Sequence, residues 1–267
     1  MGKNKKQVIL IGDLPLASEV FKLFHEKKRE AVIAGVLVEH PQRKFLNDPF
    51  DEKRNLCDIA RAHGVPVFFS CEEVLGHFGH RYPDIGISCR ASIIYKRNFI
   101  DCFRTYFINM HGGLLPERPG VNIACHSIIE GDSIGGATLH LISEKIDAGD
   151  IIERKTFTID PDDTAFRVYQ KTQLALIELI QKNIDNILNH SLKIIPQSSI
   201  YPIYQPKFFK KRHLEELKRV DLSSPPALIS RVVRGCDFPG HEPAYIMIGG
   251  KKIYLTTRPF HLSERNG

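Results

Sequence analysis

The chain has 267 residues and a net charge of +6 at pH 7, and 42% of its residues are hydrophobic and 25% charged. This composition is ordinary for a soluble globular protein with one or two domains, and no apolar run is long enough for a membrane span or a signal-peptide core, so we expect a cytoplasmic protein. The six cysteines form no CxxC pair, which predicts free thiols, and the basic residues are mixed with acidic ones, so the charge alone does not indicate nucleic-acid binding.

Short apolar runs alternate with helical patterns in the first part of the chain. Residues 7–11 form a continuous apolar run that predicts a buried parallel strand, and residues 16–26 have apolar positions at helical spacing. By the same criteria we predict strands over 31–38, 65–69, 85–89 and 106–110, helices over 55–63 and 71–78, and a polar loop over 41–53. This alternation is typical of an α/β fold, here a Rossmann-like, doubly wound and mostly parallel sheet.

The second part of the chain changes character near residue 191. Before that point we predict a short helix over 123–130, strands over 137–142 and 151–157, and a helix over 165–188. Asp162 or Asp163 would cap this long helix. After it come a proline-punctuated loop, helices over 213–219 and 227–234, and strands over 244–248 and 252–256. We therefore expect a catalytic domain over 1–190 and a small C-terminal α+β domain over 191–267.

The turn after the first predicted strand lacks the glycines of a dinucleotide-binding site. Gly12 is followed by Asp-Leu-Pro-Leu, whereas the fingerprint G-x-G-x-x-G has two further glycines that let a pyrophosphate approach the backbone. No Walker A sequence is present either. We therefore expect no NAD, and we expect the chemistry at the carboxyl ends of later strands, where open parallel sheets carry their sites. We also expect no metal.

Three polar residues form the strongest candidate site. Asn109 ends a predicted strand and His111 follows two positions later, so both side chains point to the same side of an extended chain. Asp147 lies in the loop after the next predicted strand. An amide NH₂ can donate to an oxyanion, an imidazole can transfer a proton, and a carboxylate can stabilise that imidazole. These are the actions that acyl transfer to an amine requires.

The motifs around these residues resemble those of the N10-formyltetrahydrofolate-dependent formyltransferases. The family's signature looks like N-x-H-x-x-L-L-P-x-x-x-G, here residues 109–120, followed by a D-x-G loop, here residues 147–149. Between them, the run from Gly131 to His140 is similar to the family's E-x-G-D…G-x-T-x-H segment. The resemblance implies that Asn109, His111 and Asp147 are catalytic and that N10-formyltetrahydrofolate is the formyl donor.

The same resemblance implies a folate site and a direct mechanism. The folate-binding positions correspond here to Ser92, Ile93, Ile94, Tyr95, Leu141, Ile142, Ser143 and Asp147. The amine would attack the formyl carbon directly, without a covalent enzyme intermediate. Asn109 and His111 would stabilise the oxyanion, while His111 and Asp147 would handle the amine proton.

The acceptor is indicated by comparison among the branches of this family. Glycinamide ribonucleotide enzymes usually carry a phosphate loop where this chain has Asp-Leu-Pro-Leu, methionyl-tRNA formyltransferases have a larger basic C-terminal barrel, and formyl-folate hydrolases have an N-terminal regulatory domain. Residues 234–253 instead resemble the R-A-x-x-x-P-x-x-x-A-Y…G-x-K-x-x end of the nucleotide-sugar N-formyltransferases. This resemblance implies a dTDP-linked 4-amino- or 3-amino-dideoxyhexose, or GDP-perosamine, as acceptor in O-antigen biosynthesis.

Four residues are candidate contacts to the nucleotide sugar. Tyr201 and Tyr204 would meet the base, and Arg118 and Lys207 would contact the pyrophosphate. The base, the sugar stereochemistry, the formylated amine and a homodimer built on the C-terminal strands stay open. A methionyl-tRNA or glycinamide ribonucleotide formyltransferase is the alternative within the family, and a non-catalytic nucleic-acid-binding protein is the alternative outside it. Otherwise we expect no nucleic-acid or membrane partner.

Overall fold

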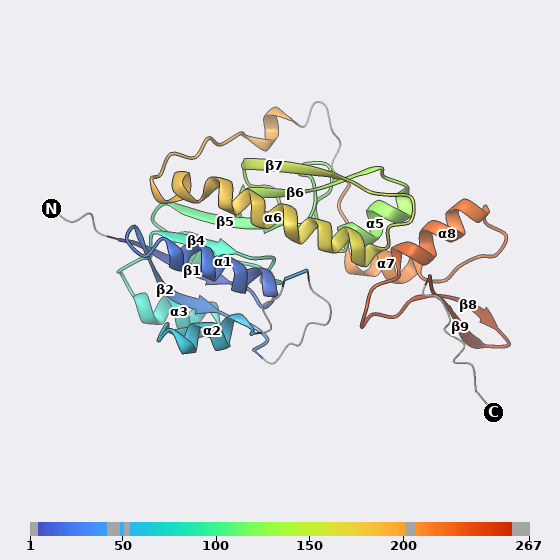
Figure 1. Cartoon of the computed structure of the whole chain (residues 1–267), viewed down its shortest axis with the longest axis horizontal. Coiled ribbons are helices and arrows are strands. Elements are labelled where there is room, and N and C mark those ends of the chain that lie inside the picture. Colours follow the sequence, from blue (N-terminus) through green and yellow to red (C-terminus); the bar gives the residue numbers. More distant parts are fainter. Residues whose placement is uncertain (1–4, 42–48, 51–53, 201–206, 258–267) are drawn as a thin grey trace.

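The computed structural model describes residues 5–41, 49–50, 54–200 and 207–257. Figure 1 shows a twisted sheet flanked by helices, with the C-terminal helices and a hairpin at one end of the molecule. The elements in chain order are β1 (Lys6–Ile11), α1 (Pro15–Glu26), β2 (Ala31–Leu37), α2 (Leu56–Ala62), β3 (Val67–Phe68), α3 (Cys71–Phe78), β4 (Ile85–Ser88), α4 (Arg97–Ile100), β5 (Tyr106–His111), α5 (Ile123–Glu130), β6 (Ile134–Leu141), β7 (Ile151–Thr158), α6 (Ala165–Leu188), the 3₁₀ helix η1 (Gln197–Ser199), α7 (Lys211–Leu217), α8 (Pro226–Gly235), β8 (Ala244–Ile248) and β9 (Lys251–Leu255).

The main sheet has seven strands in the order β3-β2-β1-β4-β5-β6-β7. Strands β1 to β5 pair in parallel, whereas β6 pairs antiparallel with both β5 and β7. The strand order reverses between β1 and β4, which is the topology of a doubly wound sheet. The prediction of a Rossmann-like, mostly parallel α/β fold is confirmed.

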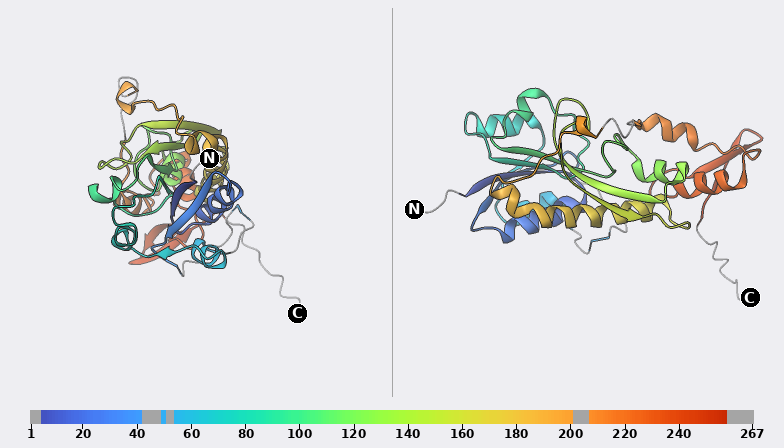
Figure 2. Two further views of the ribbon diagram at one scale, coloured as in Figure 1. Left: turned by 90° about the vertical axis from the view of Figure 1, so that its left-hand side faces the viewer. Right: turned by 90° about the horizontal axis from the view of Figure 1, so that it is seen from above.

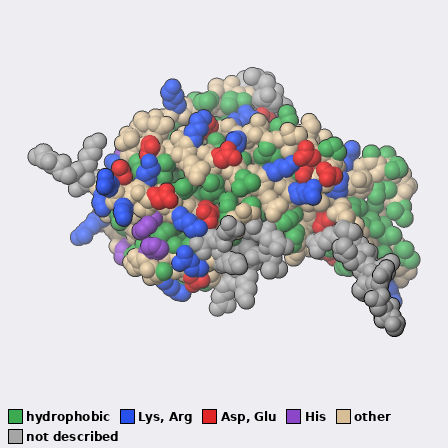
Figure 3. Space-filling model, in the orientation of Figure 1, with side chains coloured by type: hydrophobic (Ala, Val, Ile, Leu, Met, Phe, Trp, Pro, Cys, Tyr) green, Lys and Arg blue, Asp and Glu red, His purple; other side chains and the backbone are tan. Residues whose placement is uncertain are grey.

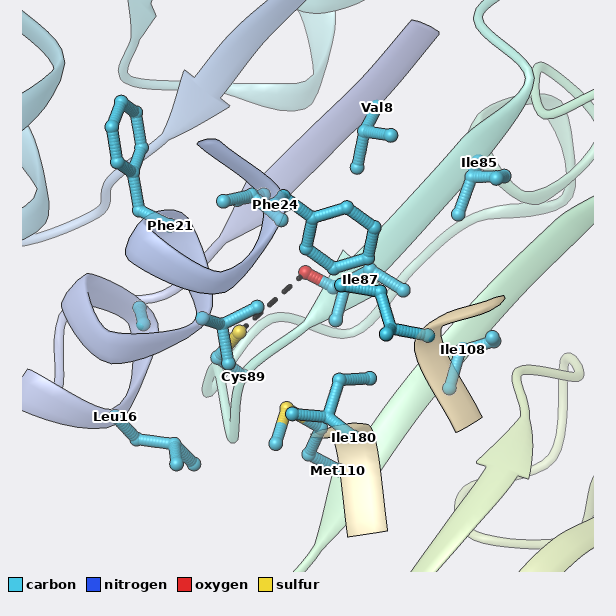
Figure 4. Close-up of a cluster of buried hydrophobic side chains, with 14 of the residues drawn as sticks. Val8, Leu16, Phe21, Phe24, Ile85, Ile87, Cys89, Ile108, Met110 and Ile180 are labelled. Carbon is cyan, nitrogen blue, oxygen red and sulfur yellow. Dashed lines mark hydrogen bonds between the residues drawn. The ribbon is translucent and has the colours of Figure 1, made fainter. Parts of the chain in front are cut away.

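Hydrophobic cores lie on both faces of the sheet. Helices α1, α2 and α6 cover one face, where Phe24, Ile87, Met110 and Ile180 belong to one buried cluster (Figure 4). Helices α3 and α4 cover the other face, on which Phe99 is buried. Figure 2 shows α6 and α3 on opposite sides of the strands. Strands covered on both faces read in sequence as continuous apolar runs, which is why most of them could be predicted.

The start of α6 differs from the prediction. Thr164, and neither Asp162 nor Asp163, is the N-cap residue, and its hydroxyl accepts the backbone N–H of Arg167 at 3.3 Å. Asp163 is buried in the turn before the helix and pairs with Lys171 at 2.5 Å. Its carboxylate accepts the backbone N–H of Asp160 in the turn and pairs with Lys171, two helical turns further on, so it does not cap the helix.

Some element boundaries also differ. The short elements α4 and η1 were not predicted, because apolar spacing carries little information over so few residues. Strand β3 is shorter than the predicted 65–69, since Pro66 has no N–H to donate to a neighbouring strand. Strand β6 begins before residue 137 and includes Gly136, where a Cβ would lie 2.3 Å from the side chain of Leu114. Close packing therefore explains a glycine inside this strand.

The C-terminal elements share a hydrophobic core with the helices next to the main sheet. Ile129 of α5, Val168 of α6 and Val232 of α8 belong to one buried cluster. Strands β8 and β9 form a separate antiparallel pair with exposed apolar side chains, among them Ile248 and Tyr254. Figure 3 shows hydrophobic side chains gathered at this end of the molecule. The small α+β unit has the expected elements, and the domain division at residue 190 stays a prediction.

Candidate active site

The predicted catalytic residues lie together at the carboxyl end of β5. Asn109 and His111 occupy alternate positions on this strand, so both side chains leave the same face of the sheet. Strand β6 runs antiparallel beside β5 and places His140 opposite Asn109. Asp147 follows in the next loop, with Oδ1 3.5 Å from Nδ1 of His111 and 3.7 Å from Nε2 of His140. The structure thus adds His140 to the predicted three.

The imidazole of His140 orients the amide of Asn109. Nδ1 of His140 lies 2.8 Å from the carbonyl oxygen of Leu141, which can only accept, so Nδ1 carries the proton. Nε2 then accepts a hydrogen bond from the Asn109 amide nitrogen at 3.0 Å. Burial, together with the neighbouring His111, holds the pKa of His140 well below its usual range, which favours the neutral ring. The amide has a second hydrogen, which can donate to a substrate oxygen.

His111 is held by the backbone on one side and faces a carboxylate on the other. Nε2 donates to the carbonyl oxygen of Arg118 at 2.8 Å, so the lone pair of the neutral ring is on Nδ1. Nδ1 faces Oδ1 of Asp147, and the residue is only 6% exposed. A proton accepted at Nδ1 would produce an imidazolium beside a carboxylate, which stabilises the charge. His111 therefore has the geometry of a general base.

The loop that carries Asp147 is fixed by several contacts. Asp147 has a φ of +53°, in the left-handed region, and its Oδ2 accepts the backbone N–H of Gly120 at 2.8 Å. The buried amide of Gln197 donates to the carbonyl oxygens of Asp147 at 2.9 Å and Gly149 at 2.6 Å. A Cβ on Gly149 would lie 1.8 Å from the carbonyl oxygen of Leu141, which explains the glycine of the D-x-G motif.

Three residues that support the site were not among the predicted site residues. His140 and Thr138 belong to the G-x-T-x-H run, so the motif was a signal for both of them. The hydroxyl of Thr138 donates to the carbonyl oxygen of Gly113 at 2.7 Å and accepts the N–H of Leu115 at 3.1 Å, which holds the chain after His111. The third residue, Gln197, lies far along the chain in η1, and nothing in its local sequence indicated this contact.

The predicted folate-site residues follow the two strands that pair with β5: β4 ends beside Asn109, whereas the antiparallel β6 ends beside Ile108. They are Ser92, Ile93, Ile94 and Tyr95 after β4, and Leu141, Ile142 and Ser143 at and after the end of β6. The hydroxyl of Tyr95 donates to Ser88 Oγ at 3.0 Å, and the Tyr95 ring stacks on Phe99. Ile94 is 75% exposed, and Ser143 is also exposed. Their role in binding folate stays a prediction.

The two predicted pyrophosphate contacts are both paired with a carboxylate. The guanidinium of Arg118 and the ammonium of Lys207 each form an ion pair with Glu130. Phosphate binding by either cation would compete with this carboxylate, and that role stays a prediction. The predicted base contacts, Tyr201 and Tyr204, lie outside the described residues.

Other features of the described residues lie away from this site. Asp13, Glu39 and His40 each bring one ligand-type atom within 4.8 Å of the others, but His40 is exposed and we assign no metal site there. A cavity of about 490 Å³ lies beside the start of α6, lined in part by Arg167 and Arg234. Across the ranges that the structure describes, no helix combines the length and apolar character needed to cross a membrane.

Comparison with known proteins relates this geometry to a family. Residues 6–182 match the protein-family model described as Formyl transferase. A methionyl-tRNA formyltransferase of Bacillus velezensis is 29% identical over 252 residues, which cover 92% of this chain and 76% of that protein.

Solved structures share the fold at lower sequence identity. A 4-N formyltransferase from Francisella tularensis superposes with a TM-score of 0.76 at 21% identity, covering 94% of this chain and 96% of that one. An N-formyltransferase from Helicobacter canadensis, in complex with folinic acid and dTDP-3-aminofucose, superposes with a TM-score of 0.71 at 22% identity, covering 93% and 86%.

Proposed function

The chain belongs to the formyl transferase family, and from this premise we propose that it transfers a formyl group from N10-formyltetrahydrofolate to the amine of a nucleotide-linked amino-dideoxy sugar. The observation that carries the proposal is the arrangement of four polar side chains at one strand end. His140 orients the Asn109 amide, and the basic nitrogen of His111 faces Asp147. This arrangement supplies an oxyanion donor and a general base side by side.

Each of these groups has a step in the reaction. The amine nitrogen attacks the formyl carbon and a C–N bond forms. The carbonyl oxygen becomes an oxyanion, which accepts a hydrogen bond from the second N–H of the Asn109 amide. Nδ1 of His111 takes the proton of the attacking nitrogen, and Asp147 stabilises the imidazolium. When the bond between the formyl carbon and the folate nitrogen breaks, that proton passes to the leaving nitrogen. The enzyme ends in its starting protonation state and forms no covalent bond.

Exposed apolar side chains on two loops support a folate as the formyl donor. Ile94 and Ile146 are 75% and 52% exposed on the loops after β4 and β6, so apolar side chains are available to pack against a flat heterocycle. The structural neighbour from Helicobacter canadensis is a complex with folinic acid, which supports the same class of donor here.

Structural likeness supports a nucleotide sugar as acceptor. The Helicobacter canadensis neighbour is a complex with dTDP-3-aminofucose, and the Francisella tularensis neighbour is described as a 4-N formyltransferase. The proposal covers dTDP-linked 3-amino- and 4-amino-dideoxyhexoses and GDP-perosamine. The formylated sugar would enter a surface polysaccharide such as an O antigen.

Methionyl-tRNA is a second candidate acceptor. The Bacillus velezensis relative carries that activity in its name, and the sequence match spans most of this chain. The four side chains could serve either amine, because their chemistry depends only on the formyl group and the attacking nitrogen. The acceptor must therefore be tested directly.

A parallel assay separates the acceptors. The purified chain is incubated with N10-formyltetrahydrofolate and, separately, with dTDP-amino sugars, GDP-perosamine and initiator methionyl-tRNA, and products are identified by mass spectrometry. We expect a formylated nucleotide sugar, and we expect Asn109→Ala to lose about 10²–10³ in rate as a control. Formylation of the tRNA alone would overturn the acceptor, and no transfer to any amine would overturn the reaction.

A further inference from the structure

A short segment before α7 lies against the loop that follows His111. We call residues 207–210 the strap and residues 117–121 the catalytic loop. Phe209 of the strap and Gly120 of the loop form a parallel bridge. Gly120 has a φ of +104°, and a Cβ there would lie 2.2 Å from the carbonyl oxygen of Phe209, so the approach requires glycine.

Backbone groups of the catalytic loop alternate between the strap and the catalytic side chains. Three hydrogen bonds of 3.0–3.2 Å face the strap: Lys207 N–H to the Glu117 oxygen, Phe209 N–H to the Pro119 oxygen, and Val121 N–H to the Phe209 oxygen. The residues between them face the active site, where the Arg118 carbonyl accepts from His111 and the Gly120 N–H donates to Asp147, each at 2.8 Å. Successive residues of an extended segment present their polar groups to opposite sides, so one segment makes both sets of bonds.

The side chain of Phe209 anchors the strap. Phe209 is 3% exposed, and its ring stacks on His126 of α5 with the centroids 4.1 Å apart and the planes at 25°. The guanidinium carbon of Arg118 and the ammonium of Lys207 lie 5.4 and 5.5 Å from the centre of the same ring. Stacking and cation–π contacts thus hold the strap against α5 beside the catalytic loop.

We propose that the strap positions the catalytic pair: Phe209 holds the catalytic loop so that its backbone fixes both His111 and Asp147. Phe209 is then a positioning residue that acts through the Arg118 carbonyl and the Gly120 N–H. The kinetic consequence rests on the proposed function, whereas the ordering of the His111 ring can be measured without any turnover.

Two substitutions and a matched control test the strap. Phe209→Ala removes the anchor, Phe209→Leu keeps an apolar side chain, and Leu214→Ala removes another buried side chain of the C-terminal core, from α7. The first readout is the NMR resonance of the His111 Nε2 proton, which the bond to Arg118 should protect from exchange. The second is kcat, measured with KM for the formyl donor at a temperature where every variant is folded.

We expect Phe209→Ala to lose the protected proton and to lower kcat by about 10- to 100-fold with KM for the donor within about twofold, because small displacements of catalytic groups act on the chemical step. Leu214→Ala should keep the proton and most of kcat, and Phe209→Leu, which keeps an apolar side chain without the ring contacts, should lose less of kcat than Phe209→Ala. The proposal is overturned if Phe209→Ala keeps either the proton or kcat, or if Leu214→Ala loses both equally. If the wild type formylates no amine, the proposed function fails. The positioning role of the strap would still be supported if the protected Nε2 proton of His111 is present in the wild type and lost only in Phe209→Ala.

Discussion

His140 should affect catalysis only through Asn109, and replacement by phenylalanine tests this. The residue is 2% exposed, and phenylalanine fills the same space but lacks the Nε2 that accepts from Asn109 at 3.0 Å. A neutral hydrogen bond contributes about 1 kcal/mol net, and about 1.4 kcal/mol is tenfold in rate. Complete loss of an oxyanion donor costs about 10²–10³. We therefore expect His140→Phe to lower kcat by about fivefold, clearly less than Asn109→Ala.

The assay is a double-mutant cycle on kcat for formyl transfer at saturating donor and acceptor. It compares the wild type, His140→Phe, Asn109→Ala and the double variant, with a melting curve for each to verify folding. Once the amide is gone there is nothing for the ring to orient, so His140→Phe should cost less than about twofold in the Asn109→Ala background. An equal loss of about fivefold in both backgrounds would refute this reasoning, because His140 would then act independently of Asn109.

Three further substitutions test the site and its supports. Asp147→Asn should lower kcat by about 10²-fold or more with the fold intact, because a neutral amide cannot stabilise the imidazolium, and near-normal turnover would contradict the assigned role. Burial lowers the pKa of His126 to about 4, so the unfolded chain binds a proton first and the free energy of unfolding should fall as the pH drops from about 6.5 to about 4. In denaturant titrations the free energy of unfolding of His126→Phe should fall by roughly 2 kcal/mol less than that of the wild type between pH 7 and pH 4.5. An equal fall in both proteins would count against this assignment. Gly149→Ala should lower the melting temperature by more than Gly64→Ala, because a Cβ at 149 would lie 1.8 Å from a carbonyl oxygen while one at 64 has no neighbour within 4 Å; equal shifts would argue against the steric reason.

The sheet and the placement of Asn109 and His111 on one side of a strand could be predicted because their signals are local. Strands buried on both faces give continuous apolar runs, and the alternation of side chains along an extended chain places Asn109 and His111 on one side. The role of His140 depends on the register between β5 and β6, which pairs residues 109 and 140. An antiparallel register of this kind is set by tertiary packing and cannot be read from either strand alone.

The supports of the site depend on long-range contacts that leave no local pattern. Gln197 reaches the backbone of the Asp147 loop, and Phe209 reaches the catalytic loop, from segments far along the chain. Arg118 was expected to contact a pyrophosphate, and its ion pair with Glu130 of α5 is a further tertiary contact that the local sequence does not indicate. The helix cap was misassigned because consecutive aspartates and a threonine all suit an N-cap, and local propensity does not choose between them.

The central claim is that His111, facing Asp147, is the base for formyl transfer at this site. The most direct test is the single-turnover rate of formyl transfer from N10-formyltetrahydrofolate to a nucleotide-linked amino sugar, measured for the wild type and for His111→Gln at equal occupancy by the donor. The prediction is a formylated sugar in the wild type and a rate at least about 10²-fold lower in the variant, with donor affinity retained. A variant that transfers the formyl group at close to the wild-type rate would contradict the claim.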